Sequence, residues 1–500
     1  MTERTSLIRV AGGFGCAILA LATLLVHDVG YLLTQPFWLD EAWVAMSTRV
    51  PLGELTDVTA VSPTGWTALL RLVPVGGGGL RLLPMAFAML TVLAAYWLGR
   101  TVWDSLGAGV VAGLLAAVSA LLAPTALARG DLKQYTADAF VALLALALLG
   151  RLESSWSRWR LLGLAAAGPL GMLISHPAAF VVPAALLAVS VVQLGRRQWR
   201  RLLDCCVAGA LAALGMGLVY LTLDRPHVVA SIQDYWTAFY LPWRDGVGAT
   251  VRFLGERSVT LDGAGLGPFW LCLPLVALGI VVLVRVGRPA VALTVPLLGA
   301  GLLTASGLRY YPLLNFRTSH FLLTILAAVA ALGVSGLVVL AGRRQVAAGV
   351  IIALAAVGGY AWAGSDGWRS HLIPLEDVRS QVRYLEDHQV ESDVIVVDYG
   401  ASFGFGYYYR PADPQLRPTD AVATQFVVDY PADARIVVMS GGARADIRAA
   451  LARARAVGGP DARIWVVRAH GGPNLNAVWE AVVPEATELD VGPDPLLLVE

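Results

Sequence analysis

The sequence predicts a polytopic α-helical membrane protein with about eleven transmembrane helices and a C-terminal soluble α/β domain. Three observations support this fold class. Hydrophobic residues make up 57% of the 500-residue chain and charged residues only 15%, a composition outside the range of ordinary soluble enzymes. Long apolar runs recur throughout residues 1–363. Beyond them the apolar runs become short and alternate with helical patterns, which predicts a separate domain over residues 364–500.

Each predicted span is an apolar run of about 20 residues, the length that crosses a hydrocarbon core of about 30 Å. The runs are residues 8–33, 80–101, 107–127, 135–150, 159–175, 177–194, 203–223, 267–286, 289–306, 318–341 and 345–363. The first run is too long for the apolar part of a signal peptide and further spans follow it. We therefore interpret it as a retained membrane anchor.

Arginine placement predicts the orientation of the spans. If the N-terminus is cytoplasmic, every short inside loop is basic, as in "GRRQWRR" (195–201) and "AGRRQ" (341–345). Cytoplasmic loops of membrane proteins carry this excess. An odd number of spans then places residues 364–500 outside the plasma membrane, together with the long loops 34–79 and 224–266. Any functional site is expected on that outer face.

The tail has the pattern of an α/β domain. Its apolar strand-like runs are residues 393–399, 434–440, 462–468 and 495–500, and its helical patterns are residues 375–389, 445–458 and 476–482. Strands alternating with helices predict a small layer with a mostly parallel sheet. The aromatic segment "YGASFGFGYYYR" (399–410) could stack on a sugar or pack against the sheet or the membrane surface. We find no catalytic constellation in this domain.

Charge and cysteine usage exclude two other classes. The net charge is +1 and no long basic run occurs, so nothing indicates a nucleic-acid partner. All four cysteines lie in apolar runs, which leaves the soluble tail without a disulfide framework.

The segment "QPFWLDEAW" (35–43) is the sharpest functional signal. Asp40 and Glu41 directly follow the first span on the outside, between Trp38 and Trp43. Charged groups close to hydrocarbon are costly, so adjacent carboxylates at a membrane face indicate a functional site. The alternative is a solvated loop with an interfacial aromatic belt.

An Asp–Glu pair in this place resembles the GT-C family of membrane glycosyltransferases. That family includes protein O-mannosyltransferases and the aminoarabinose transferases that modify lipid A. The next segment, "LRLLPMAFAMLTVLAAYWLGR" (80–100), is similar to the family's second-span region. The resemblance covers residues 1–363 in order and topology.

The segment "ARGDLKQYTADAF" (128–140) resembles a motif of bacterial members of the family. It supplies candidate substrate-binding residues Arg129, Asp131, Lys133, Tyr135 and Asp138. Tyr135 and Asp138 are three residues apart and share a helix face. An unpaired carboxylate inside the membrane is costly, and Lys133 or Arg129 could be the partner of Asp138. Lys133 is the only lysine in the chain, which favours a function. An interfacial ion pair that fixes the helix end is the alternative.

The segment "LRYYPLLNFRTSHF" (308–321) provides two further substrate-binding candidates, Arg317 and His320. The resemblance implies that an arginine in this region meets the phosphate of a lipid donor, and Arg317 is the best match. Aromatic anchoring with snorkelling arginines would also explain the segment.

The resemblance implies a glycosyltransferase that moves a sugar from a polyprenyl-phosphate donor in the membrane lipid to an extracytoplasmic acceptor hydroxyl. Such a reaction needs a base and a cation for the departing phosphate. We expect Asp40 to act as the base, with Glu41 supporting acceptor or metal binding, and Arg317 and Lys133 to meet the phosphate. A single carboxylate acting by direct displacement predicts inversion at the anomeric carbon. A divalent cation on Asp40 with Asp131 or Asp138 is left open.

Two functions of other classes also remain open. A transporter or flippase of lipid-linked sugars would have inverted repeats and helices broken near mid-membrane, a pairing that the sequence does not display. A non-catalytic membrane scaffold would tolerate the loss of Asp40.

Overall fold

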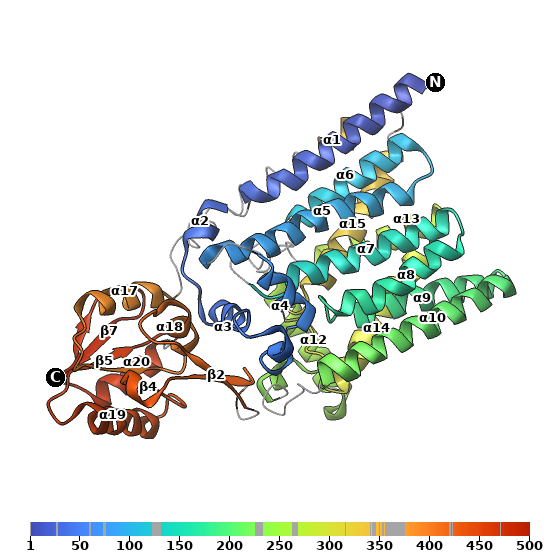
Figure 1. The fold of residues 1–500 in the computed structure, drawn as a ribbon. Helices are drawn as coiled ribbons and strands as arrows, with labels where there is room; N and C mark the ends of the chain where they lie inside the picture. Colours follow the sequence, from blue (N-terminus) through green and yellow to red (C-terminus); the bar gives the residue numbers. More distant parts are fainter. Residues whose placement is uncertain are drawn as a thin grey trace.

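The computed structural model shows a helical bundle with a small sheet domain at one end (Figure 1). It describes residues 2–26, 29–59, 62–73, 77–122, 132–225, 234–262, 269–315, 317–340, 376–419 and 424–500 except 471, with a few single positions between these ranges. We call the end of the bundle that carries the sheet domain the domain end.

Each predicted span before residue 345 corresponds to a helix of the bundle. These helices are α1 (Thr2–Val26), α5 (Leu82–Val102), α6 (Leu106–Leu122), α7 (Tyr135–Ser154), α8 (Arg158–Met172), α9 (Ala178–Gly195), α10 (Trp199–Val219), α13 (Phe269–Arg285), α14 (Pro289–Gly307) and α15 (His320–Leu340). In the described part of the chain, 7 helices are long and apolar enough to cross a membrane, and two shorter apolar helices accompany them. The predicted span 345–363 lies largely outside the described residues.

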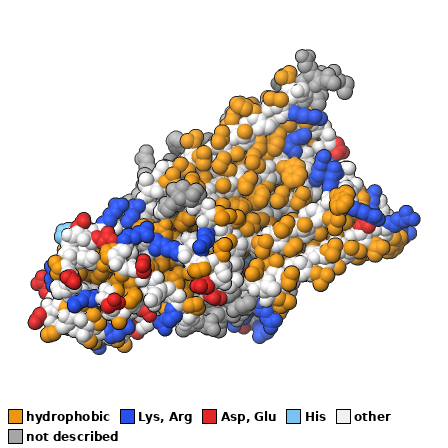
Figure 2. All heavy atoms as spheres, viewed as in Figure 1, with side chains coloured by type: hydrophobic (Ala, Val, Ile, Leu, Met, Phe, Trp, Pro, Cys, Tyr) orange, Lys and Arg blue, Asp and Glu red, His pale blue; other side chains and the backbone are white. Residues whose placement is uncertain are grey.

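The surface of the bundle fits a lipid environment. Apolar side chains cover the visible face of the helices, and Lys and Arg side chains lie at the two ends of the molecule, on the sheet domain and at the bundle end opposite it (Figure 2). Leu7 and Phe14 of α1 and Leu214 of α10 are more than half exposed. Exposed apolar residues in such numbers are rare on soluble proteins. The chain is therefore a multi-pass helical membrane protein.

Close helix contacts build the interior of the bundle. Helix α5 packs against α6 and α7, and α15 against α6 and α13. At Gly99 of α5, a Cβ atom would lie 2.5 Å from the backbone of Ala112 in α6. The absence of a side chain there lets the two backbones approach, as small residues do in membrane helix pairs.

The long loop predicted at residues 34–79 is largely helical. It contains α3 (Leu39–Ser47), α4 (Thr64–Arg71) and the short 3₁₀ helices η1 (Leu52–Asp57) and η2 (Gly77–Arg81). The short helix α2 (Val29–Thr34) precedes α3, and both lie at the domain end (Figure 1). The Asp–Glu pair thus stands on a helix and not on an extended loop.

The C-terminal domain contains a five-stranded sheet in the order β4-β1-β5-β7-β6. Its strands are β1 (Val394–Val397), β4 (Ile436–Val438), β5 (Ile464–Val467), β6 (Thr487–Leu489) and β7 (Leu496–Val499). Strands β4, β1 and β5 are parallel, whereas β7 is antiparallel to both β5 and β6. The predicted parallel pairing is found for β4, β1 and β5, but the β6–β7 hairpin adds two antiparallel pairings, so the sheet is mixed. A separate hairpin pairs β2 (Gln415–Pro418) with β3 (Phe426–Asp429).

Helices cover both faces of this sheet. The predicted helical patterns form α17 (Val378–His388), α19 (Arg444–Gly458) and α20 (Gly472–Val482). Alternate residues of a strand face opposite sides, so Ile395 packs with the α17 and α18 (Ser402–Tyr408) side, whereas Val394 packs with α19. Phe403 and Phe405 of α18 are fully buried, and α18 packs against α3. The aromatic segment 399–410 therefore has the packing role that was one of its two predicted uses.

Candidate functional site

Helix α3 directs its two carboxylates to different surroundings. Asp40 and Glu41 lie in its first turn, and successive residues on an α-helix point about 100° apart. The side chain of Asp40 is 17% exposed, whereas that of Glu41 is 1% exposed. Only Asp40 is therefore open to solvent and to a substrate.

Two cations share one oxygen of Asp40. Lys133 Nζ lies 3.2 Å from Asp40 Oδ2, and an Arg317 guanidinium nitrogen donates a hydrogen bond to the same oxygen. Burial would raise the pKa of Asp40, but Lys133 and Arg317 outweigh it and lower this pKa to about 2. Asp40 is thus a carboxylate in the resting protein, with a surplus of positive charge beside it.

Aromatic rings hold both cations. Lys133 lies 4.7 Å from the ring of Trp43, and the Arg317 guanidinium lies 5.1 Å from Trp38 and 5.6 Å from Tyr135. Cation–π contacts of this kind are strengthened when water is partly excluded. The structure therefore brings Asp40, Lys133, Tyr135 and Arg317 together from three predicted motifs.

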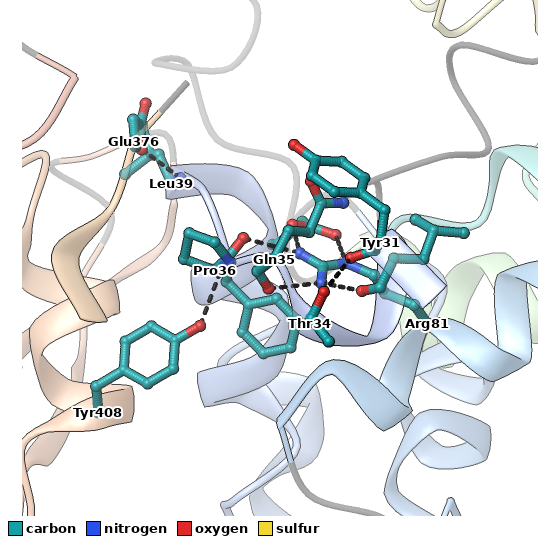
Figure 3. Close-up of polar contacts among 11 residues, drawn as sticks. Tyr31, Thr34, Gln35, Pro36, Leu39, Arg81, Glu376 and Tyr408 are labelled. Carbon is teal, nitrogen blue, oxygen red and sulfur yellow. Dashed lines mark hydrogen bonds and ion pairs between the residues drawn. The ribbon is translucent and has the colours of Figure 1, made fainter. Parts of the chain in front are cut away.

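Glu41 pairs with a residue that the sequence did not single out. Arg81 donates to both of its carboxylate oxygens, at 2.7 and 2.5 Å. Arg81 is 2% exposed and also donates to the backbone carbonyls of Leu32, Gln35 and Pro36 (Figure 3). The sequence feature that could have identified Arg81 is a single arginine at the start of an apolar span.

A glycine allows Arg81 to reach this position. At Gly78 a Cβ atom would lie 2.1 Å from the carbonyl oxygen of Leu33. Only glycine permits η2 to come this close to α2. Arg81 is the last residue of η2, and this close approach places its guanidinium next to residues 35 and 36, which lead into α3.

Of the remaining predicted residues, Asp138 and His320 form no hydrogen bond or ion pair with Asp40 among the described residues, and two others lie outside those residues. Asp138 is 2% exposed, with Ser175 and His176 close by, and its Oδ1 has no hydrogen-bond partner among the described residues. Lys133, one of the two partners considered for Asp138, pairs with Asp40 instead. His320 is buried at the start of α15, and its Nδ1 also has no partner in the described chain. Arg129 and Asp131 lie outside the described residues.

The charges around Asp40 suit an anion better than a divalent cation. A metal ligand set needs several oxygen, nitrogen or sulfur donors without competing cations, and here Lys133 and Arg317 already occupy Asp40. Within the described ranges, no group of three His, Cys, Asp or Glu side chains could hold a metal ion. Asp131, one of the predicted ligands, is not among those residues.

The chain is a multi-pass membrane protein with a fold like that of ArnT. Its fold is also similar to that of an archaeal oligosaccharyltransferase. ArnT from Cupriavidus metallidurans bound to undecaprenyl phosphate is 16% identical, with a TM-score of 0.57 over 96% of this chain and 97% of that one. The oligosaccharyltransferase AglB from Archaeoglobus fulgidus, in complex with an inhibitory peptide and a dolichol-phosphate, gives a TM-score of 0.52 at 12% identity, over 92% of this chain and 69% of that one. These likenesses define the fold.

Sequence similarity points to the same group of proteins. The undecaprenyl phosphate-alpha-4-amino-4-deoxy-L-arabinose arabinosyl transferase of Pseudomonas aeruginosa is 33% identical over 202 residues, and that of Pseudomonas paraeruginosa is equally similar. The match spans 40% of this chain and 34% of the relative, so it covers about a third of the length of these proteins. No family model matches the chain. The predicted resemblance to aminoarabinose transferases is confirmed.

Proposed function

We propose that this protein is a membrane glycosyltransferase that moves a sugar from a polyprenyl-phosphate donor to a hydroxyl acceptor. The observation that carries the proposal is the contact of one half-buried carboxylate, Asp40, with two cations, Lys133 and Arg317. This reaction needs both a base for the acceptor hydroxyl and cations for the departing phosphate, one on each side of the anomeric carbon. The similarity to undecaprenyl-phosphate-dependent transferases supports this choice of donor.

The reaction is a direct displacement. The acceptor oxygen bonds to the anomeric carbon as the bond from that carbon to the phosphate oxygen breaks, and the electron pair leaves with the phosphate. The acceptor proton passes to a carboxylate oxygen of Asp40. No covalent sugar–enzyme intermediate is needed, so the anomeric configuration inverts.

The two cations stabilise the leaving group. The donor phosphate is a diester with one negative charge, and the departing polyprenyl phosphate gains a second. Lys133 and Arg317 interact more strongly with the larger charge, which lowers the barrier and not merely the donor KM. When they turn towards the phosphate, their hold on Asp40 weakens and its pKa rises, which makes it a better base.

Other predicted residues receive roles consistent with their positions. Tyr135 flanks Arg317 and would orient it. Asp138 and His320, each with a buried polar atom that has no hydrogen-bond partner among the described residues, would contact donor groups. Glu41 supports the site through Arg81 and not through the acceptor. Arg129 and Asp131 remain candidate substrate-binding residues by sequence alone.

The topology belongs to the same proposal. We infer about eleven spans over residues 1–363, a cytoplasmic N-terminus and an extracytoplasmic domain at residues 364–500. The arginines at the bundle end opposite the domain, as seen in Figure 2, support this orientation. Asp40 would then open to the side where lipid-linked donors replace nucleotide sugars.

The test is transfer of label from radioactive polyprenyl-phosphate sugars in membranes that contain the protein. Undecaprenyl phosphate aminoarabinose is the first donor to try. The native protein is compared at equal expression with Asp40→Asn and with Asp57→Asn, a control on the exposed surface of η1. We expect loss of transfer with Asp40→Asn alone. Transfer unaffected by Asp40→Asn would refute the assigned base, and no transfer from any donor would favour a transporter or scaffold.

A further inference from the structure

The N-terminus of α3 takes its hydrogen-bond partner from the distant C-terminal domain. The first amide groups of a helix have no acceptor within the helix, and the residue before it usually supplies one. That residue here is Trp38, which forms no side-chain capping bond. Leu39 N donates instead to Glu376 Oε2 at 2.7 Å, across 337 positions of sequence (Figure 3).

Glu376 is itself fixed from the C-terminal domain. Its side chain is 6% exposed, and its other oxygen lies 2.5 Å from His470 Nδ1. The hydrogen bond that His470 Nδ1 donates to the Glu376 carboxylate raises the pKa of His470. His470 follows β5 with a φ of 60°, a backbone conformation that side-chain-bearing residues rarely adopt. Such a conformation persists where the surroundings require it, often at functional sites.

Further contacts bind the same helix to the same domain. Phe37 N donates to Tyr408 Oη at 2.8 Å, just before α3. Just after α3, Arg49 donates to the carbonyls of Gly406 and Tyr407, at 3.0 and 2.8 Å. Trp43 and Met46 of α3 share one buried core with residues of α17, α18 and β5. The domain therefore contacts α3 at its N-terminal end, along its buried face and at its C-terminal end.

We propose that the C-terminal domain positions the catalytic carboxylate, with Glu376 as the positioning residue and His470 as its support. Leu39 and Asp40 are neighbours in the first turn of α3, so a carboxylate that fixes the Leu39 amide fixes the direction in which Asp40 faces Lys133 and Arg317. This inference rests on the proposed role of Asp40 as the base. It makes the domain a structural part of the active site and not a separate acceptor-binding module.

The first test uses Glu376→Gln, with Glu391→Gln as a matched control on an exposed surface of the same domain. Two quantities are measured: the kinetics of sugar transfer, and hydrogen exchange of the α3 amides in detergent. Small misplacements of a reacting group can cost about 100-fold in rate. We expect Glu376→Gln to lower kcat by about 10- to 100-fold, to leave the donor KM within about twofold, and to speed exchange at residues 39–47. Glu391→Gln should change none of these.

A double-variant comparison separates positioning from a general loss of folded protein. If Glu376 acts through Asp40, then Glu376→Gln should not further reduce the residual transfer of Asp40→Asn, measured over long incubations. An equal loss in both backgrounds, or unchanged exchange in α3, would overturn the proposal. A native protein without transfer would refute the proposed function instead, and the exchange comparison would still decide whether the domain holds α3.

Discussion

The Glu41–Arg81 pair provides the strongest test of how the site is built. The informative changes are Glu41→Gln, which removes one charge with little change of shape, and Arg81→Leu, which removes the donor. If Glu41 bound an acceptor or a metal, as its sequence position first indicated, its loss would lower activity and leave stability unchanged. The structure predicts instead that the main effect is a loss of stability, because both side chains are almost completely buried.

The magnitude follows from what each change leaves unpaired. Removing one partner of a buried ion pair costs about 3–5 kcal/mol, so Glu41→Gln should destabilise the protein by about 3 kcal/mol. Arg81→Leu leaves Glu41 charged and also removes the donor from three backbone carbonyls. Each buried carbonyl without a donor costs about 1–3 kcal/mol. We therefore expect a loss of at least about 5 kcal/mol for Arg81→Leu.

The assay is unfolding of purified protein in mild detergent, followed by far-UV circular dichroism as denaturant is added. Arg158→Leu is the matched control, because its pair with Asp204 has side chains that are 74% and 20% exposed and should contribute less than about 1 kcal/mol. The double variant Glu41→Leu/Arg81→Leu should recover part of the stability, since no buried charge remains unpaired. Glu41→Gln with the stability of Arg158→Leu would refute the reasoning.

Three further predictions concern the cluster around Asp40. Arg317→Ala should lower kcat by about 100- to 1,000-fold, the usual cost of losing one transition-state donor. The control Arg244→Ala, at an exposed arginine, should leave kcat unchanged. Equal kinetics of the two variants would show that Arg317 does not contact the phosphate. Because the pKa of Asp40 is lowered on folding, the Asp40 carboxylate stabilises the folded protein above the unfolded pKa of about 3.9, and this stabilisation is lost as pH falls towards about 2. In Lys133→Ala the loss of stability in acid should be smaller. An unfolding profile unchanged from the native protein between about pH 4 and about pH 2 would contradict the ion pair. The anomeric configuration of the product, determined by NMR, should be inverted, and retention would require a second nucleophile.

The membrane helices could be predicted because each one is a local property of the sequence. A run of about 20 apolar residues has few alternatives, and every predicted span before residue 345 is a helix. The mixed sheet could not be predicted in the same way. Strand β6, "TEL", is three exposed or half-buried residues, and its pairing with β7 depends on tertiary contacts and not on its own pattern.

The site was only partly predictable for the same reason. Asp40, Lys133 and Arg317 were identified separately, and their contact joins segments up to 277 positions apart. The adjacency of Asp40 and Glu41 suggested one shared role, but on a helix adjacent residues diverge. Glu376 gave no signal in the sequence, because a single glutamate before a helix in a soluble domain resembles any surface residue.

The resting arrangement of charges has a consequence for how the proposed reaction is controlled. Asp40 takes the place of an anion between Lys133 and Arg317, so a carboxylate occupies the position that the phosphate needs. We expect a donor phosphate to draw Lys133 and Arg317 away from Asp40, and this exchange raises the basicity of the carboxylate as the leaving group is bound. The base is therefore weak without a donor and stronger with one, which couples proton abstraction to donor binding. Polyprenyl phosphate without sugar should make the same exchange and inhibit the protein competitively against the donor.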